Sequence, residues 1–381
     1  MDTDTLPVRF ALSRLPADMK TPCFVFDPEV VQARLDALKR ALGGGVIVSI
    51  KANPLVDVFV RCTHAFTDGV EVASIGELNL VIGRLSAPRF VNTPALDPDL
   101  MAAAHASRST IILDNPEHVA TYAARFTADP ARARLMLRVN AGELVGGKLG
   151  ARYRDQFGMD GRTLIDSARR LVQAGYKLSG LSVFGGSNSF ADLALPIAGA
   201  IGELVAEVEA STGARLELLN LGGGLPADWE NADLPFAQYR AKLGELPPHL
   251  SIMHEAGRAL FAAAGVFAVR LVTIKSIAGR RIGVCDGGLA QCFLLAQTES
   301  LMKRPKRGIL LERRASDAEG GSMLELVGSS CSRADVIGEL DCSEGEPQTG
   351  DIVLFEDCGA YHTYSPTGFL NLRPAARYVV S

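Results

Sequence analysis

Short runs of apolar residues alternate with longer amphipathic segments from about residue 22 to residue 265. Uninterrupted apolar and β-branched runs are typical of strands that are buried on both faces of a parallel sheet. The segment 28–42 is typical of the helices between them, because Asp27-Pro28 supplies an N-cap followed by proline at the first helical position. The predicted strands are Cys23–Phe26, Val46–Ile50, Val70–Ala73, Phe90–Asn92, Thr110–Leu113, Leu135–Val139, Leu178–Phe184, Leu216–Leu221 and Ile252–Glu255.

These repeated strand–helix units predict an α/β fold with a (β/α)8 TIM-type barrel. Their total length, about 240 residues, is the usual size of such a barrel. The pattern alone leaves a doubly wound sheet as an alternative. Nine strands are one more than the barrel needs, so we expect one of them to lie outside it.

The character of the chain changes after about residue 265. Short alternating apolar runs separated by turn residues are typical of antiparallel strands. They occur at Val266–Lys275, Arg281–Cys285, Met323–Val327 and Ile352–Phe355. We therefore predict a barrel over residues 22–265 and a C-terminal antiparallel β domain over residues 266–381, to which residues 1–21 contribute a strand.

Composition excludes several classes of protein. The chain has 381 residues, 48% of them apolar, and a formal net charge of -4, which gives no electrostatic reason to bind nucleic acid or an anionic membrane. No segment approaches the roughly 20 apolar residues of a membrane span. The acidic N-terminus lacks the features of a secretion signal. Seven cysteines without CxxC or HExxH spacing predict free thiols and no metal site. We expect a soluble cytoplasmic protein.

The first candidate functional residue is a lysine. Val46-Ile-Val-Ser-Ile-Lys51-Ala-Asn-Pro54 places it at the end of an apolar strand. Lysine is costly there unless it is paired, covalently bonded or extended into a site. Because desolvation favours the neutral, nucleophilic amine, Lys51 could condense with an aldehyde cofactor. The commoner alternative is a lysine that extends its amine to water.

Two further motifs also follow predicted strands. Gly222-Gly-Gly224 could bring backbone N–H groups close to a phosphate, and Arg258 could bind the same group with its guanidinium. Glu255 could face a cationic ring nitrogen, since an ion pair at about 4 Å is worth roughly 4 kcal/mol at an effective dielectric of about 20. The alternative is a surface ion pair between Glu255 and Arg258.

The C-terminal part of the chain offers two more candidates. Gly328-Ser-Ser-Cys331-Ser-Arg-Ala-Asp335 places a cysteine in a small, polar segment, where a thiol can reach a ligand. Asp357-Cys-Gly-Ala-Tyr361 offers a tyrosine hydroxyl beside a turn. Neither motif is specific by itself.

The motifs are recognisable as an ordered set. They are Lys51-Ala-Asn-Pro54, Gly69-Val-Glu71 with Glu77, Arg138, Gln156-Phe-Gly158, Gly185-Gly-Ser187, Gly222–Gly224, Glu255-x-Gly257-Arg258, Gly328-x-x-Cys331 and Gly359-Ala-Tyr361. From about residue 20 to 373 the chain resembles the fold-type III pyridoxal-phosphate-dependent amino-acid decarboxylases, the family of ornithine and diaminopimelate decarboxylases. That resemblance implies an alanine racemase-like barrel.

The resemblance also implies roles for the matched residues. Lys51 would hold pyridoxal 5'-phosphate covalently and return a proton, Glu255 would pair with the pyridine nitrogen, and Cys331 would donate a proton after carbon dioxide leaves. The phosphate would be held by Ser187, Gly222, Gly223, Gly224, Arg258 and Tyr361, and Phe184 and Gly257 would also bind the cofactor. Glu77 and Arg138 would help to position Lys51 and the ring, and Glu71 occupies a position beside the lysine that is usually acidic. In this family the cysteine loop crosses to the partner's barrel, which implies a homodimer with shared active sites.

Departures from the family pattern bear on the substrate. Phe184 stands where the family has a histidine stacked on the ring, and Ser332 replaces an acidic residue after the cysteine. Thr298 stands where ornithine-type enzymes place an aspartate, and the arginine and tyrosine that bind diaminopimelate are absent from residues 286–295. A buried ammonium without a carboxylate is costly, so free ornithine and diaminopimelate are not the expected substrates. The predicted substrate-binding residues are Thr298, Ser332 and Asp335.

The closest resemblance is to a subgroup of siderophore and antibiotic pathways. Its marks are Val70-Glu-Val-Ala-Ser, Arg154-Asp-Gln-Phe-Gly-Met-Asp160 and Tyr364-Ser-Pro-Thr-Gly-Phe369. We therefore expect α-decarboxylation of an L-amino acid or its conjugate, including a carrier-protein conjugate, in siderophore or other secondary-metabolite biosynthesis.

Three alternatives stay open. The first is an ornithine-, lysine- or diaminopimelate-type decarboxylase of primary metabolism. The second is an amino-acid racemase, although racemases of this architecture place an arginine rather than a carboxylate against the pyridine nitrogen. The third is a noncatalytic pyridoxal-phosphate-binding regulator, although such a protein would be expected to have lost Lys51 or Cys331.

Overall fold

The computed structural model describes residues 9–129, 133–292, 294, 306–312, 323–362 and 368–380. The chain separates into two compact units. Among the described residues, the first unit is Gln32–Ala259, and the second combines the segment up to Val31 with the segment from Leu260 onward. Each unit is described below by itself.

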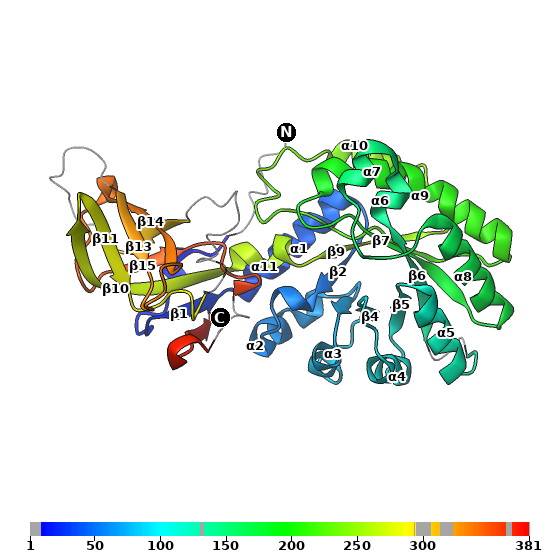
Figure 1. The fold of residues 1–381 in the computed structure, drawn as a ribbon, viewed down its shortest axis with the longest axis horizontal. Helices are drawn as coiled ribbons and strands as arrows, with labels where there is room; N and C mark the ends of the chain where they lie inside the picture. The colour runs from blue at the N-terminus through cyan, green and yellow to red at the C-terminus, as the bar shows by residue number, and fades with distance from the viewer. Residues whose placement is uncertain are drawn as a thin grey trace. The chain divides into compact units, whose positions relative to one another are not determined.

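The first unit is a closed barrel of parallel strands (Figure 1). Its strands follow one another in chain order, and the ring closes where β2 pairs with β9 in parallel. They are β2 (Gly45–Ser49), β3 (Val70–Val72), β4 (Arg89–Asn92), β5 (Thr110–Leu113), β6 (Arg134–Asn140), β7 (Leu178–Phe184), β8 (Leu218–Asn220) and β9 (Ser251–Ala256). The predicted (β/α)8 barrel is confirmed.

Helices connect the barrel strands, and local sequence explains where several of them begin. In α4 and α5, Asp97 and Asn115 cap the first turn, and each is followed by a proline at the start of the helix. The helices are α1 (Pro28–Leu42), α2 (Val56–Phe59), α3 (Ile75–Val81), α4 (Pro98–Ala106), α5 (Pro116–Arg125), α6 (Ala141–Val145), α7 (Gly147–Arg152), α8 (Gly161–Gln173), α9 (Phe190–Thr212), α10 (Phe236–Leu243) and α11 (Arg258–Phe261).

A layer of apolar side chains fills the barrel. Ile47, Phe90 and Met136, from β2, β4 and β6, form one buried cluster with Ile112, and Leu218 of β8 packs against it. Side chains from alternate strands forming one layer are the usual filling of such a barrel. The interior is therefore a packed core, and polar groups are left to the carboxyl-terminal strand ends.

The second unit is built on one eight-stranded sheet with the order β11-β13-β14-β12-β15-β10-β1-β16. Its strands are β1 (Cys23–Phe26), β10 (Gly265–Ile277), β11 (Arg280–Cys285), β12 (Arg307–Leu310), β13 (Met323–Val327), β14 (Val336–Asp341), β15 (Ile352–Phe355) and β16 (Ala376–Val379). Most neighbours are antiparallel, but β1–β16, β11–β13 and β12–β14 are parallel. The predicted antiparallel character is confirmed for most pairs, and the three parallel pairs make the sheet mixed.

The first predicted barrel strand belongs to this second sheet. β1 pairs antiparallel with β10 and parallel with β16, so its assignment to the barrel was wrong and the surplus strand is accounted for. The prediction that residues 1–21 add a strand was also wrong for the described residues 9–21, which contain one short 3-10 helix, Leu12–Arg14. The strand begins at Cys23, after that segment.

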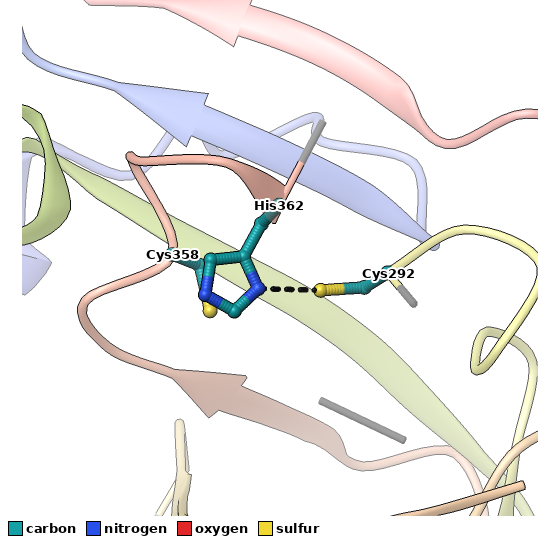
Figure 2. A group of neighbouring side chains, drawn as sticks. All are labelled: Cys292, Cys358 and His362. Carbon is teal, nitrogen blue, oxygen red and sulfur yellow. Dashed lines mark hydrogen bonds between the residues drawn. The ribbon is translucent and has the colours of Figure 1, made fainter. Parts of the chain in front are cut away.

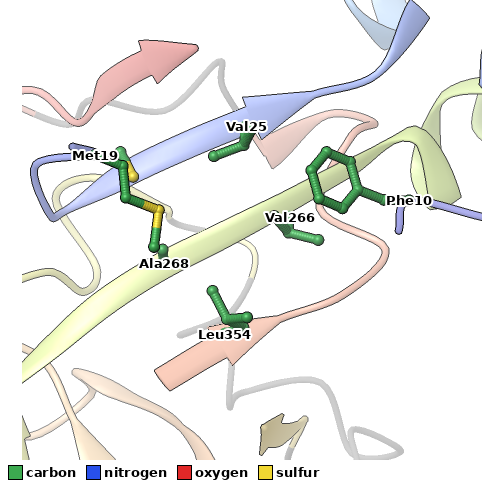
Figure 3. Close-up of a cluster of buried hydrophobic side chains, with 7 residues drawn as sticks. Phe10, Met19, Val25, Val266, Ala268 and Leu354 are labelled. Atoms are coloured by element: carbon green, nitrogen blue, oxygen red, sulfur yellow. The ribbon is translucent and has the colours of Figure 1, made fainter. Parts of the chain in front are cut away.

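The N-terminal segment contributes apolar side chains to the second unit's core. Phe10 and Met19 are buried against Val25 of β1, Val266 of β10 and Leu354 of β15 (Figure 3). All four residues of β1 are buried, which a strand achieves by pairing in the interior of the sheet. Burial on both faces gives β1 the same apolar signal as a barrel strand.

Length and hydropathy separate the described helices from membrane spans. The 23-residue α9 is the longest helix in the described part of the chain, and no described helix is both long and apolar enough to cross a bilayer.

Candidate active site

Lys51 lies at the carboxyl-terminal end of a barrel strand. It belongs to a short 3-10 turn, Ile50–Ala52, that directly follows β2. Its Nζ donates hydrogen bonds to both carboxylate oxygens of Glu71 on β3, at 2.8 and 2.9 Å. The Glu71 side chain is 2% exposed and the Lys51 side chain 42% exposed, so a buried acid holds an accessible amine. The hydroxyl of Ser49 donates to Glu71 Oε2 at 2.6 Å and fixes that carboxylate from the other side.

Glu255 ends up buried beside this pair. Two amides donate to the same oxygen, Oε1: Asn220 Nδ2 at 2.7 Å and Asn92 Nδ2 at 3.3 Å. Burial raises the pKa of Glu255 to about 7, and the charge of Glu71 adds to the rise, whereas Lys51 and the Asn220 hydrogen bond oppose it. A buried carboxylate whose pKa is raised in this way is stabilised by a cation placed against it. The position therefore fits a protonated ring nitrogen.

Arg138 is buried at the same end of the barrel and is paired. Its Nη1 donates to Asp114 Oδ1 at 3.1 Å, and its guanidinium lies 4.5 Å from the ring centroid of Phe157. Asp114 Oδ1 also accepts from the amide of Gly158 at 3.1 Å. The pair thus connects β6 to the predicted Gln156-Phe-Gly158 motif and holds that loop in place.

Several buried polar atoms at these strand ends have no hydrogen-bond partner among the described residues. They are Arg138 Nε on β6, Asn92 Oδ1 on β4 and Ser182 Oγ on β7. Buried polar groups are normally hydrogen-bonded, so unsatisfied ones indicate a missing polar partner. Their chemistry, one donor, one acceptor and one hydroxyl, fits a polar aromatic cofactor.

Close packing requires the glycine triplet after β8. Gly222 has a φ of +64°, and a side chain on Gly223 would collide with the carbonyl oxygen of Glu255. A side chain on Gly224 would come within 2.6 Å of the carbonyl oxygen of Gly186. Glu255 N donates to Gly222 O at 2.7 Å, so the turn is fixed directly beside the buried acid. No described residue accepts a hydrogen bond from the amides of Gly223 and Gly224, which leaves both suitable for an anion.

The other predicted cofactor residues of the barrel surround this turn. Phe184 is the last residue of β7, and its ring lies beside Gly222, where a Cβ would be 3.3 Å from it. Ser187 is exposed in the following loop. Gly257 is buried after β9, and Arg258 begins α11. The structure therefore brings the predicted phosphate residues of the barrel to one rim, although their contact with a phosphate stays a prediction.

Glu77 has a local structural role. Ser74 accepts a hydrogen bond from the Glu77 amide at 3.1 Å, and Glu77 Oε2 accepts from the Ala73 amide at 2.8 Å. Ser74 is thus the N-cap of α3, and the Glu77 carboxylate binds the amide of the residue before the cap, in a variant of the capping box. Burial raises the pKa of Glu77, and the charges of Glu71 and Lys51 act on it in opposite directions. The predicted influence on Lys51 is therefore electrostatic.

The remaining predicted residues lie in the second unit. Cys331 is exposed. Asp335 is 2% exposed and accepts from the amides of Leu289 at 2.6 Å and Ser330 at 3.0 Å, so its carboxylate holds the cysteine loop together. Ser332 Oγ accepts from the Ala334 amide at 3.2 Å within that loop. Tyr361 adopts a φ of +64°. Thr298 lies outside the described residues, and the proposed substrate contacts of all three substrate-binding candidates stay predictions.

Sequence reasoning missed four site residues. They are Ser49, Asn92, Asp114 and Asn220, which satisfy Glu71, Glu255 and Arg138. Each stands at the end of a barrel strand or directly after it, where functional groups gather. A systematic search for polar residues at the strand ends would have found them.

The closed barrel and the charged groups at its carboxyl-terminal rim define the class as a barrel enzyme with a site for pyridoxal phosphate. The family model for the pyridoxal binding domain of pyridoxal-dependent decarboxylases matches residues 29–262, so the chain belongs to the pyridoxal-dependent decarboxylases.

Whole-length relatives have consistent names. The chain is 28% identical over 377 residues to the diaminopimelate decarboxylase of Deinococcus radiodurans, covering 96% of this chain and 92% of the relative. It is 27% identical over 380 residues to that of Actinosynnema pretiosum, covering 92% of this chain and 82% of the relative. The protein is therefore a pyridoxal-phosphate-dependent amino-acid decarboxylase, a carboxy-lyase.

Solved structures share the fold. The lysine/ornithine decarboxylase of Vibrio vulnificus in complex with putrescine matches with a TM-score of 0.79 at 19% identity, covering 96% of this chain and 95% of that chain. Diaminopimelate decarboxylase from M. jannaschi matches with a TM-score of 0.80 at 18% identity, covering 95% and 88%. At these identities the likeness concerns the fold.

Proposed function

We propose that the protein removes one α-carboxylate of a free diamino acid, with diaminopimelate as the first candidate. The whole-length relatives named diaminopimelate decarboxylase support this substrate class. They lend no support to the predicted siderophore subgroup or to a carrier-bound conjugate, and the alternative of a diaminopimelate-type decarboxylase agrees with them better. The departures at Phe184 and Ser332, and the absence of the usual arginine and tyrosine from residues 286–295, are then changes within that class.

The proposed chemistry rests on the buried environment of Glu255. Its carboxylate is 7% exposed, and both amide donors, from Asn92 and Asn220, reach the same oxygen. Such a group stabilises positive charge that faces it. When bound, pyridoxal phosphate supplies the electron sink for the electrons left by the departing carboxylate. Glu255 would maintain that capacity by keeping the ring nitrogen protonated.

Lys51 and Glu71 have two other proposed roles at the rim, which are to hold the cofactor and to orient the amine that holds it. Lys51 is the residue that would hold the cofactor covalently, and its Nζ would move a proton. Glu71 accepts two hydrogen bonds from that Nζ and therefore orients it. The phosphate would bind at the free amides of Gly223 and Gly224. The roles of Lys51 and of the glycine amides are those that the family resemblance implies, whereas the orienting role of Glu71 is inferred from its hydrogen bonds with Lys51.

A substrate panel tests the proposal. Carbon dioxide release is measured with meso-diaminopimelate, L-lysine, L-ornithine, L-arginine and a citryl conjugate of a diamino acid. We expect diaminopimelate to have the highest kcat/KM. A substrate without its second carboxylate would leave polar groups of the pocket unpaired, which lowers kcat/KM by at least about 100-fold. Lys51→Ala serves as the inactive blank. Its matched control is Lys39→Ala, which removes a surface ion pair with Asp68. Preference for the conjugate would overturn the proposal.

Cys331→Ala tests the proposed proton donor. The thiol is exposed in the second unit, so its removal leaves the barrel groups intact. We expect cofactor binding and its visible absorption to persist, while kcat falls by about 100-fold or more, as is typical when a general acid is lost. Product analysis should also reveal misplaced protonation. Cys342→Ala, which removes a buried thiol outside the predicted site, is the control; equal turnover of both variants would remove Cys331 from the mechanism.

A further inference from the structure

Three side chains with metal-binding chemistry meet inside the second unit. Cys292, Cys358 and His362 each offer one ligand atom, and these atoms all lie within 4.8 Å of one another. The three side chains point toward one another, and Cys292 Sγ is 3.0 Å from His362 Nδ1 (Figure 2). All three are buried: both cysteines are 0% exposed and the histidine is 6% exposed. No role proposed above uses them.

Two anchored turns carry these residues. Cys292 follows β11, and its amide donates to Gly288 O at 2.8 Å. Cys358 follows β15, and its amide donates to Gly265 O at 2.8 Å. Gly359 permits the second turn to pack closely, because any side chain there would collide with the carbonyl oxygen of Phe261. The donor atoms are therefore held by fixed backbone before any ligand binds.

The distances suit a tetrahedral ion with thiolate and imidazole ligands. Bond lengths of about 2.3 Å to sulfur and about 2.0 Å to nitrogen place two sulfurs about 3.8 Å apart and a sulfur and a nitrogen about 3.5 Å apart. The observed 3.0 Å and the 4.8 Å limit bracket these values, so small rotations of the side chains suffice. Thiolate and imidazole together select soft or borderline metals over Mg²⁺ or Ca²⁺.

The charges also fit. Two thiolates and a neutral imidazole around Zn²⁺ form a site with no net charge, whereas Cu⁺ would leave one negative charge. A neutral cluster avoids the cost of burying an isolated ion.

We propose that Cys292, Cys358 and His362 bind one thiophilic d10 metal ion, Zn²⁺ or Cu⁺, in the second unit. Binding forms two metal–sulfur bonds and one metal–nitrogen bond, and the thiol protons pass to solvent. Three protein ligands complete a trigonal Cu⁺ site, or leave Zn²⁺ one position for water or a small ligand. The bound ion would join the turn after β11 to the Gly359-Ala-Tyr361 turn. This site does not depend on the proposed decarboxylation.

Its absence from the sequence prediction has a simple reason. That prediction searched for CxxC and HExxH spacing, whereas here Cys358 and His362 are joined by the fold to a cysteine 66 positions earlier in the chain. The C-x3-H pair by itself has no diagnostic value. Only the packing of the two turns supplies the third ligand.

Metal titration of the intact protein tests the site. Untagged, cofactor-loaded and fully reduced protein is titrated with Zn²⁺ and, anaerobically, with Cu⁺ in competition with a chromophoric chelator. We expect one ion per chain in each titration. Cys292→Ser, Cys358→Ser and His362→Asn should each weaken binding by at least about 100-fold. Cys342→Ser, which alters another buried cysteine of the same unit, and Cys331→Ala should leave it unchanged.

A measurement on the unaltered chain keeps the proposal falsifiable if the variants fold poorly. X-ray absorption of the loaded protein should show two sulfur ligands and one imidazole nitrogen in the first coordination sphere. Four outcomes would overturn the proposal. They are no stoichiometric uptake of metal, metal uptake that survives all three substitutions, a Cys292–Cys358 disulfide in protein purified without reductant, and a first coordination sphere of oxygen ligands.

Discussion

At the residue scale, three charged side chains share one rim of the barrel. The positive charge of Lys51 neutralises the negative charge of the Glu71 carboxylate directly, through two hydrogen bonds from its amine. Glu255 has amide donors but no cation in direct contact among the described residues, and its pKa is raised to about 7 chiefly by burial. The apoprotein is therefore destabilised by a carboxylate that prefers to be protonated, a cost that a facing cation would remove.

Glu255→Gln should make this cost visible in the apoprotein. The folded chain keeps the Glu255 proton up to a pH of about 7, whereas the unfolded chain releases it near its ordinary pKa of 4.5. Between these values the folded state binds more protons, so the contribution of Glu255 to the free energy of unfolding falls as pH rises. Above pH 7 the variant should be more stable than the wild type, by on the order of 3 kcal/mol.

Denaturant unfolding of both apoproteins at a series of pH values measures this difference. It should be close to zero below pH 4.5, where both side chains are neutral in both states. Comparison of the two chains also removes the opposing contribution of His254, whose pKa burial lowers to about 4. A wild type that remained the more stable of the two above pH 7 would show that Glu255 is ionised at no net cost.

At the element scale, the turns after the barrel strands determine the site. The β8 turn places Gly222–Gly224 against the carbonyl oxygen of Glu255 and against the loop after β7. The hydrogen bonds of Ser74 and Glu77 likewise fix the start of α3 directly after β3, which carries Glu71. The positions of the charged side chains therefore depend on short segments with tightly specified backbone.

Gly223→Ala should disrupt the β8 turn through one methyl group. The new Cβ would collide with the carbonyl oxygen of Glu255, so either the turn or β9 must shift. We expect a loss of about 1–3 kcal/mol in the free energy of unfolding, as for other overpacked sites, together with at least about 10-fold weaker pyridoxal phosphate binding. Gly76→Ala is the control, because its Cβ would meet nothing closer than 3.7 Å. Similar cofactor affinity in both variants would show that the β8 turn does not contribute to cofactor binding.

At the scale of the whole molecule, the predicted catalytic groups belong to different units of the chain. Lys51 lies in the barrel unit and Cys331 in the mixed β unit. The family resemblance predicts that the cysteine of one subunit serves the barrel of its partner. A homodimer with shared sites therefore stays a prediction.

Mixing two inactive variants tests the shared site. Equal amounts of Lys51→Ala and Cys331→Ala chains are combined, dissociated and reassembled. If sites are shared, half of the dimers are mixed, and each has one site with both wild-type residues, so about a quarter of the wild-type activity should return. Sites built within one chain would stay inactive after mixing. Sedimentation of each variant alone confirms that both still assemble.

The sequence by itself determined the fold class, the cofactor and the chemical class. Apolar strand segments and helix caps such as Asp97-Pro98 are local signals, and the spacing of Lys51, Gly222–Gly224 and Glu255 follows the repeat of the barrel. The substrate subgroup could not be read in the same way. It depends on a few distal contacts, and one of them, at Thr298, lies outside the described residues.

Only the tertiary structure decided where β1 belongs and which polar side chains act together. β1 has the same apolar signal whether it is buried in a barrel or inside a mixed sheet, so its partners β10 and β16 could not be inferred from its four residues. The Asn92 and Asn220 contacts with Glu255, and the meeting of Cys292 with His362, join residues far apart in the chain. Such contacts arise when the sheets close, because hydrogen bonds and packing depend on distance in space, and local sequence does not encode that distance.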